Sequence, residues 1–172
     1  MKVFVINGYP RSGKDSFVEF CNEKYRCKNY STVDIIKTCA RLLGWNGVKD
    51  ATSRKFLSDL KDLASKAFDT SMQMGIKEML YAAQTGYDFF FIHAREPQEI
   101  EEFKGICNNF LHFNCKTIFI DRPGANDVEL SNHSDKEVEN YTYDYYVKND
   151  GTLDDWRETA YEFITKQYNS IN

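Results

Sequence analysis

Near the amino end of the chain stand the residues Gly8-Tyr9-Pro10-Arg11-Ser12-Gly13-Lys14-Asp15-Ser16, with two glycines five positions apart and a lysine directly after the second. Such glycines let a backbone fold closely around an anion, because they adopt positive φ values without a steric penalty. An apolar run over 2–6 precedes the stretch, and apolar residues at helical spacing follow it. The order strand, loop, helix predicts a phosphate site built from backbone amides and a helix N-terminus, with Lys14 reaching the β and γ phosphates. The alternative is an ordinary glycine turn with a solvated lysine.

The loop almost meets the P-loop pattern and departs from it at Asp15, where a Ser or Thr would normally touch magnesium. Ser16 comes one residue late. Either side chain is a candidate ligand of Mg²⁺, directly or through water, since this ion keeps several waters in nucleotide sites. The alternative for Asp15 is a favourable interaction with the helix dipole. Arg11 adds charge against a phosphate or points to solvent. The loop residues predicted to bind ATP are Gly8, Arg11, Ser12, Gly13, Lys14, Asp15 and Ser16.

Segments typical of strands and of helices alternate along the rest of the chain. The expected strands are 2–6, 28–33, 87–92, 116–120 and 143–148, and the expected helices follow Gly13 and Asp34 and cover 52–68, 71–84, 98–111 and 152–168. Thr152 and Asp155 have the spacing of a capping box. This alternation predicts a three-layer α/β fold, in which helices flank a five-stranded parallel sheet and ligands collect at the carboxyl ends of the strands. We expect a single domain over 1–172, with a short lid segment over 122–142.

Composition narrows the classes of partner. The 172 residues carry 26 acidic and 22 basic side chains, a formal charge of −4, so no positive field favours nucleic acid. The apolar runs are far shorter than the about 20 residues that a membrane span needs. Five cysteines without C-x-x-C spacing and three scattered histidines suit a reducing interior better than a disulfide framework or a zinc site. We expect a cytoplasmic protein that binds small-molecule nucleotides rather than nucleic acid or membrane; a homodimer is left open.

Several segments, in order along the chain, resemble the phage-type deoxynucleoside monophosphate kinases. Arg11-Ser12-Gly13-Lys14-Asp15-Ser16 looks like their GKD-type P-loop, which phosphomevalonate kinases of the animal type also carry. Arg54, Phe56, Leu57, Asp59 and Leu60 resemble a helix of the form Arg-x-apolar-apolar-x-x-Leu, and His93-Ala94-Arg95-Glu96-Pro97-Gln98-Glu99 resembles Asp-x-Arg-Phe-Pro-x-Glu. Arg122-Pro123-Gly124 and His133-Ser134-Asp135 are similar to the lid elements, and Tyr145 to Leu153 to the final strand and turn.

The resemblance implies a P-loop kinase-type fold and transfer of the γ-phosphoryl of ATP to a nucleoside or deoxynucleoside monophosphate, with Mg²⁺. Two positions depart from the family. His93 stands where the family has an aspartate of the magnesium shell, and Glu96 replaces an aromatic residue. Two other functions are therefore kept: a kinase for another phosphorylated small metabolite, and a nucleotide-binding regulatory module whose chemistry is weakened by the loss of the acid at position 93.

An acceptor phosphate is already anionic, so catalysis should rest on alignment and on neutralising charge. We expect Arg95, at the carboxyl end of a central strand, to bridge the donor and acceptor phosphates, and Arg122 to close over the γ-phosphate. The alternative for Arg95 is a salt bridge with Glu96 or Glu99, and the alternative for Arg122 is one with Asp121 or Asp127. Asp34 would hold a magnesium water or an acceptor hydroxyl, or serve as an N-cap. His93 is either a general base or, as the end of a buried strand, a histidine hydrogen-bonded to backbone. The predicted catalytic residues are Lys14, Arg95, Arg122 and Asp34. Asp34 and Arg95 are also predicted to bind the acceptor, and the resemblance adds Lys37 and Arg54, for which the alternative is a solvated helical face. The resemblance further implies that Asn149 holds the adenine, and the alternative for Asn149-Asp150-Gly151 is an ordinary turn.

Overall fold

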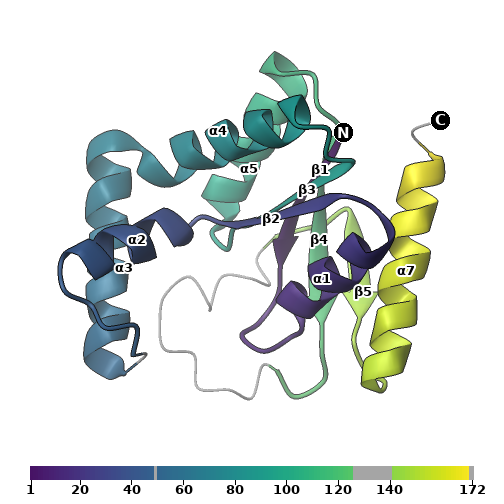
Figure 1. Cartoon of the computed structure of the whole chain (residues 1–172), viewed down its shortest axis with the longest axis horizontal. Helices are drawn as coiled ribbons and strands as arrows, with labels where there is room; N and C mark the ends of the chain where they lie inside the picture. The colour runs from purple at the N-terminus through teal and green to yellow at the C-terminus, as the bar shows by residue number, and fades with distance from the viewer. Residues whose placement is uncertain (49, 126–140, 171–172) are drawn as a thin grey trace.

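The computed structural model of the chain describes residues 1–48, 50–125 and 141–170 (Figure 1). Its strands are β1 (Lys2–Asn7), β2 (Cys27–Ser31), β3 (Phe89–His93), β4 (Cys115–Asp121) and β5 (Tyr145–Lys148). Its helices are α1 (Lys14–Lys24), α2 (Asp34–Leu42), α3 (Ala51–Phe68), α4 (Thr70–Gln84), α5 (Pro97–Gly105), the π-helical turn η1 (Ile106–Phe110) and α7 (Leu153–Asn169). The strands form one sheet in the order β2-β3-β1-β4-β5, with every neighbouring pair parallel. The predicted α/β fold with a five-stranded parallel sheet is confirmed.

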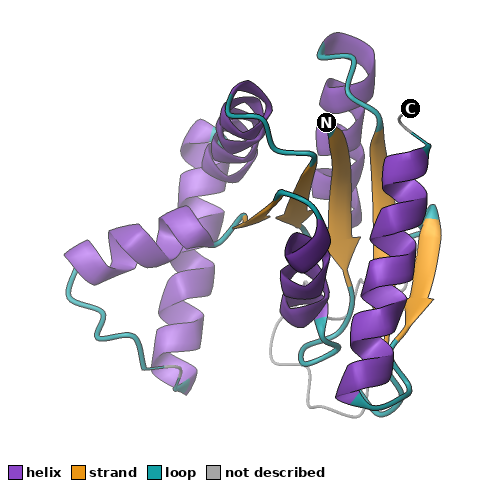
Figure 2. Ribbon diagram, turned by 45° about the vertical axis from the view of Figure 1, so that its right-hand side comes forward, coloured by secondary structure: helices purple, strands orange, loops and turns teal. Residues whose placement is uncertain are grey.

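Helices cover both faces of the sheet and give the three layers that the alternation predicts (Figure 2). Successive residues of a strand point to opposite faces. Val3 and Val5 therefore belong to the core under α4 and α5, whereas Phe4 and Ile6 belong to the core under α1 and α7. All four side chains are fully buried. A central strand buried on both faces fixes the place of the loop that follows it, at the carboxyl edge of the sheet.

Some element boundaries differ from those expected. The helix expected over 98–111 is divided, because the chain changes from α-helical to π-helical hydrogen bonding after Gly105. Strand β5 begins only at Tyr145. The preceding Asp144 turns its carboxylate to β4, where it accepts from the amide and the hydroxyl of Thr117, both at 2.9 Å. The capping box of Thr152 and Asp155 at the start of α7 is confirmed.

Helices α2 and α3 extend beyond the β2 edge of the sheet, on the side away from α7 (Figure 1). We call these two helices the arm. Asp50 caps α3 by accepting from the amide of Ser53 at 2.7 Å, but the helix itself carries no buried residue. No helix within the described ranges is long and apolar enough to cross a membrane. Most of the expected lid, residues 126–140, lies outside the described part of the chain.

Candidate active site

The loop between β1 and α1 has the backbone shape that its glycines predict. Gly8 has a φ of 144° and Gly13 a φ of 98°, both in the region that glycine favours. A Cβ atom on Gly8 would lie 2.5 Å from the carbonyl oxygen of Ile120, so the loop passes closely over β4. Gly13 occupies the N-cap position of α1, with no side chain capping the helix there. The first amides of α1 are thus available as hydrogen-bond donors to an anion.

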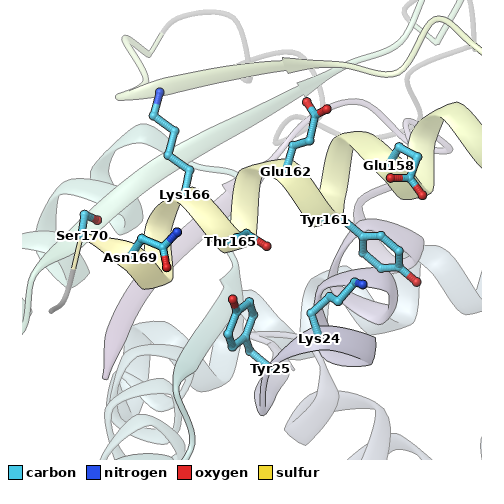
Figure 3. Close-up of a pocket in the computed structure, with 9 residues that line it drawn as sticks. All are labelled: Lys24, Tyr25, Glu158, Tyr161, Glu162, Thr165, Lys166, Asn169 and Ser170. Atoms are coloured by element: carbon cyan, nitrogen blue, oxygen red, sulfur yellow. The ribbon is translucent and has the colours of Figure 1, made fainter.

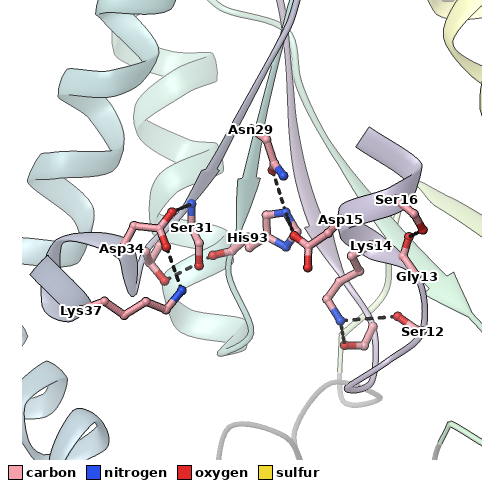
Figure 4. Close-up of polar contacts among 12 residues, drawn as sticks. Ser12, Gly13, Lys14, Asp15, Ser16, Asn29, Ser31, Asp34, Lys37 and His93 are labelled. Carbon is pink, nitrogen blue, oxygen red and sulfur yellow. Dashed lines mark hydrogen bonds and ion pairs between the residues drawn. The ribbon is translucent and has the colours of Figure 1, made fainter. Parts of the chain in front are cut away.

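Lys14 lies across this loop (Figure 4). Its Nζ donates to the carbonyl oxygens of Gly8 and Tyr9, both at 2.7 Å, and lies 3.4 Å from Oγ of Ser12. A bound phosphate would offer negatively charged acceptors in place of neutral carbonyl oxygens, and the attraction between opposite charges adds to each hydrogen bond. The ammonium group is therefore held at the loop and can exchange its carbonyl partners for phosphate oxygens.

Two residues from the carboxyl end of the chain hold the loop from outside. Asn149 is 8% exposed, and its Nδ2 donates to the carbonyl oxygen of Ser12 at 2.8 Å. The indole Nε1 of Trp156 donates to the carbonyl oxygen of Gly13 at 3.4 Å and to Oγ of Ser16 at 3.3 Å. The side chain of Asn149 thus supports the loop between β1 and α1, while its contact with adenine stays a prediction. Trp156 is not among the predicted site residues, because its partners lie more than a hundred residues away in the sequence.

The two candidate metal ligands differ in their surroundings. The carboxylate of Asp15 is 83% exposed on the first turn of α1. Ser16 donates its hydroxyl proton to the carbonyl oxygen of Gly13 at 3.0 Å and accepts from Trp156, so only one lone pair of its oxygen remains. No cluster of three or more metal-ligating side chains occurs among the residues that the structure describes. One carboxylate, that of Asp15, with the hydroxyl of Ser16 nearby fits Mg²⁺, because this ion is usually held by one or two carboxylates together with substrate phosphates and water.

His93 ends β3 next to this first turn of α1 (Figure 4). Its Nε2 lies 2.8 Å from Oδ1 of Asn29 and 3.7 Å from Oδ1 of Asp15. The ring is thus bonded to a side chain of β2 and not to the backbone as expected. Burial lowers the pKa of His93 to about 4, against the attraction of Asp15 and with the help of the Lys14 charge. The imidazole is neutral at pH 7.

Asp34 and Lys37 lie beside His93 at the exit of β2 (Figure 4). Asp34 is the first residue of α2 and the N-cap is Val33, so the N-cap alternative for Asp34 is wrong. The carboxylate instead accepts from the amide of Ser31 at 3.2 Å and pairs with Nζ of Lys37 at 2.9 Å. These two acceptor-binding candidates therefore stand at the same sheet edge as the loop, but pair with each other.

The three candidate arginines occupy different places. Arg95 is half-buried just after β3. Arg122 follows β4, and its Nη1 donates to the carbonyl oxygen of Arg11 at 3.3 Å, which brings the start of the expected lid against the loop. Arg54 is exposed on the first turn of α3, in the arm. Of the acids considered as salt-bridge partners, Asp127 lies outside the described residues.

A lysine on the arm pairs with the acids that follow Arg95. Nζ of Lys61, on α3, lies 3.2 Å from Glu96 and 3.6 Å from Glu99, and its side chain is only 15% exposed. Burial raises the pKa of Glu99, and the charge of Lys61 opposes this effect. Lys61 thus joins the arm to the segment that carries Arg95. Lys61 is not among the predicted site residues.

A groove of about 860 Å³ lies elsewhere, between the C-terminal end of α1 and α7 (Figure 3). It is lined by Lys24, Tyr25, Glu158, Tyr161, Glu162, Thr165, Lys166, Asn169 and Ser170. Because α1 leads away from the loop, this groove is at the far end of the helix and takes no part in the candidate site.

Solved structures of kinases share this fold. The chain is similar to the dephospho-CoA kinase from Campylobacter jejuni, with 15% identity and a TM-score of 0.58 over 100% of both chains. It is also similar to a sugar kinase from a Janibacter species, with 11% identity and a TM-score of 0.50 over 96% of this chain and 95% of that one. No protein-family model and no curated protein sequence matches the chain. At these identities the likeness establishes the fold alone: the chain has the three-layer α/β fold of P-loop kinases.

Proposed function

We propose that the chain transfers the γ-phosphoryl group of ATP to a nucleoside or deoxynucleoside monophosphate. One observation carries this proposal: the glycine-bounded loop, with Lys14 across it, stands at the same sheet edge as Arg95 and Asp34. A site that only bound a nucleotide would need the loop but not this second group of charges. The order of family-like segments supports the choice of acceptor.

On the donor side, the loop amides and the N-terminus of α1 receive the polyphosphate, and Lys14 neutralises charge on its β and γ groups. Arg122 approaches from the exit of β4, where it already contacts the backbone of Arg11. Mg²⁺, held by Asp15 with Ser16 as the second candidate, would supply further neutralisation of the phosphate charge when bound.

On the acceptor side, Arg95 is the candidate for bridging the two phosphates, because its planar guanidinium group donates to two oxygens at once. Asp34, Lys37 and Arg54 are the further acceptor-binding candidates. The acceptor phosphate is ionised at neutral pH and needs no general base. His93, which is neutral and hydrogen-bonded to Asn29, is consistent with this, because the proposed reaction does not need it as a general base.

A second candidate is a kinase for another phosphorylated small metabolite. Glu96, which replaces the family's aromatic residue, pairs with Lys61 and offers no ring on which a base can stack. A regulatory module that binds ATP without transferring phosphate is the third candidate, since His93 replaces the expected carboxylate.

A coupled assay of ADP formation on a panel of acceptors distinguishes the proposed function from the two other candidate functions. The panel contains nucleoside and deoxynucleoside monophosphates, phosphorylated sugars and phosphorylated alcohols, each with Mg²⁺ and ATP. Turnover that rises with one monophosphate supports the proposal. Turnover only with a sugar or alcohol phosphate favours the second candidate, and ATP binding without any acceptor-stimulated turnover favours the module.

A further inference from the structure

Asn7 is the last residue of β1 and is fully buried. Its side-chain oxygen accepts from the amide of Gly8 at 2.8 Å. Its Nδ2 donates to the hydroxyl of Tyr143 at 2.7 Å and to the carbonyl oxygen of Arg95 at 3.2 Å. One buried amide therefore joins three segments: the start of the phosphate loop, the exit of β3 and the residues that lead into β5.

This polar side chain stands where the strand otherwise carries apolar residues. Val5 and Ile6 precede it and pack in the two cores. A buried amide contributes little net stability over an apolar residue of the same shape, because its hydrogen bonds in the protein replace those it makes with water. The two N–H donors of its side chain do, however, hold their acceptors in fixed directions. The contribution of Asn7 is therefore the alignment of the segments that it joins.

We infer that Asn7 is a positioning residue that keeps the phosphate loop and Arg95 in a common register. The inference rests on the proposed function, in which the loop holds the donor and Arg95 bridges donor and acceptor. Gly8 begins the loop, and the carbonyl group of Arg95 belongs to the backbone that aims the guanidinium. A shift of about 1 Å between two such groups reduces phosphoryl transfer by about 100-fold, because alignment supplies much of the rate.

The test combines Asn7→Leu, which keeps the shape of the side chain and removes all three bonds, with Tyr143→Phe as its matched control. The control removes one partner of the same amide and leaves the bonds to Gly8 and Arg95 in place. We expect Asn7→Leu to lower kcat/KM for the acceptor about 30-fold and Tyr143→Phe by less than about threefold, at a temperature where both are folded. In an Arg95→Ala background, Asn7→Leu should add only about threefold, because the group that it aligns is gone.

A double variant whose losses multiply in full overturns the inference, as does a Tyr143→Phe enzyme as slow as Asn7→Leu. If the proposed function itself is wrong, the wild-type chain shows no acceptor-stimulated turnover, which distinguishes this result from failure of the inference about Asn7. The inference is then tested by the affinity for ADP. Asn7→Leu should weaken ADP binding about tenfold relative to Tyr143→Phe by releasing Gly8, and equal affinities in the two variants overturn the inference.

Discussion

Gly13→Ala is the substitution whose effect the structure defines most closely. Alanine would adopt a φ of 98°, a strain of about 1–2 kcal/mol. Its Cβ would lie 2.5 Å from Nδ2 of Asn149 and 3.0 Å from Nε1 of Trp156. Moving Asn149 away breaks its bond to the buried carbonyl group of Ser12, which removes about 1–3 kcal/mol more. The expected total loss of unfolding free energy is about 2–5 kcal/mol.

Gly44→Ala is the matched control. Gly44 has a φ of 99°, and a Cβ there meets nothing within 4 Å. This variant therefore carries the same backbone strain without the crowding. Urea unfolding should separate the two by about 2 kcal/mol, or roughly 4–8 °C in the thermal midpoint for a chain of this size.

Titration with ADP gives the functional arm of the same experiment. Gly13→Ala should weaken ADP binding at least about tenfold, since the loop loses its support, and Gly44→Ala should leave it unchanged. Equal losses of stability and of ADP affinity in the two variants would show that crowding at the loop has no consequence.

Three further predictions concern single side chains. Lys61→Met leaves Glu99 without its cation and should lower the free energy of unfolding by about 1–3 kcal/mol at pH 7.5. The loss should shrink at about pH 5, because burial raises the pKa of Glu99 and the protonated acid needs no cation; an equal loss at both pH values in urea unfolding contradicts the burial argument. Burial of Asp144 opposes its ionisation, but hydrogen bonds from Thr117 and two lysines outweigh this and lower its pKa to about 2. The ionised Asp144 therefore stabilises the fold above about pH 4, and this stabilisation is lost as the pH falls toward 2. Asp144→Asn should lower the free energy of unfolding by about 1–2 kcal/mol near pH 7, and this loss should narrow over that range. A loss that does not change with pH would contradict the lowered pKa of Asp144. Arg95→Ala should lower kcat about 100-fold while ADP affinity changes less than about threefold; an effect on ADP binding alone rejects the bridging role.

The elements of the fold follow from local pattern. The apolar run before Gly8, the helical spacing after Gly13 and the capping box of α7 each lie within one short segment. Their prediction needed no knowledge of distant contacts, and the structure confirms the sheet and its flanking helices. Boundaries were less predictable: β5 starts late because Asp144 bonds to Thr117 on another strand.

The side chains that hold the candidate site in place make contacts between residues far apart in the sequence, which local pattern does not predict. Asn149 reaches Ser12 across 137 positions, and Trp156 reaches Ser16 across 140. Asn7 meets Arg95 only because β1 pairs with β3 in the sheet. A sequence shows an asparagine or a tryptophan at these positions, but not which backbone it will face once the strands are ordered.

In the proposed reaction, the loop and Lys14 hold a polyphosphate for transfer. The most direct measurement is the turnover of Lys14→Ala with the acceptor that the panel identifies, alongside its unfolding midpoint. Loss of transition-state charge stabilisation should lower turnover at least about 100-fold in a variant that stays folded. A folded Lys14→Ala protein with the turnover of the wild type would exclude this role of Lys14.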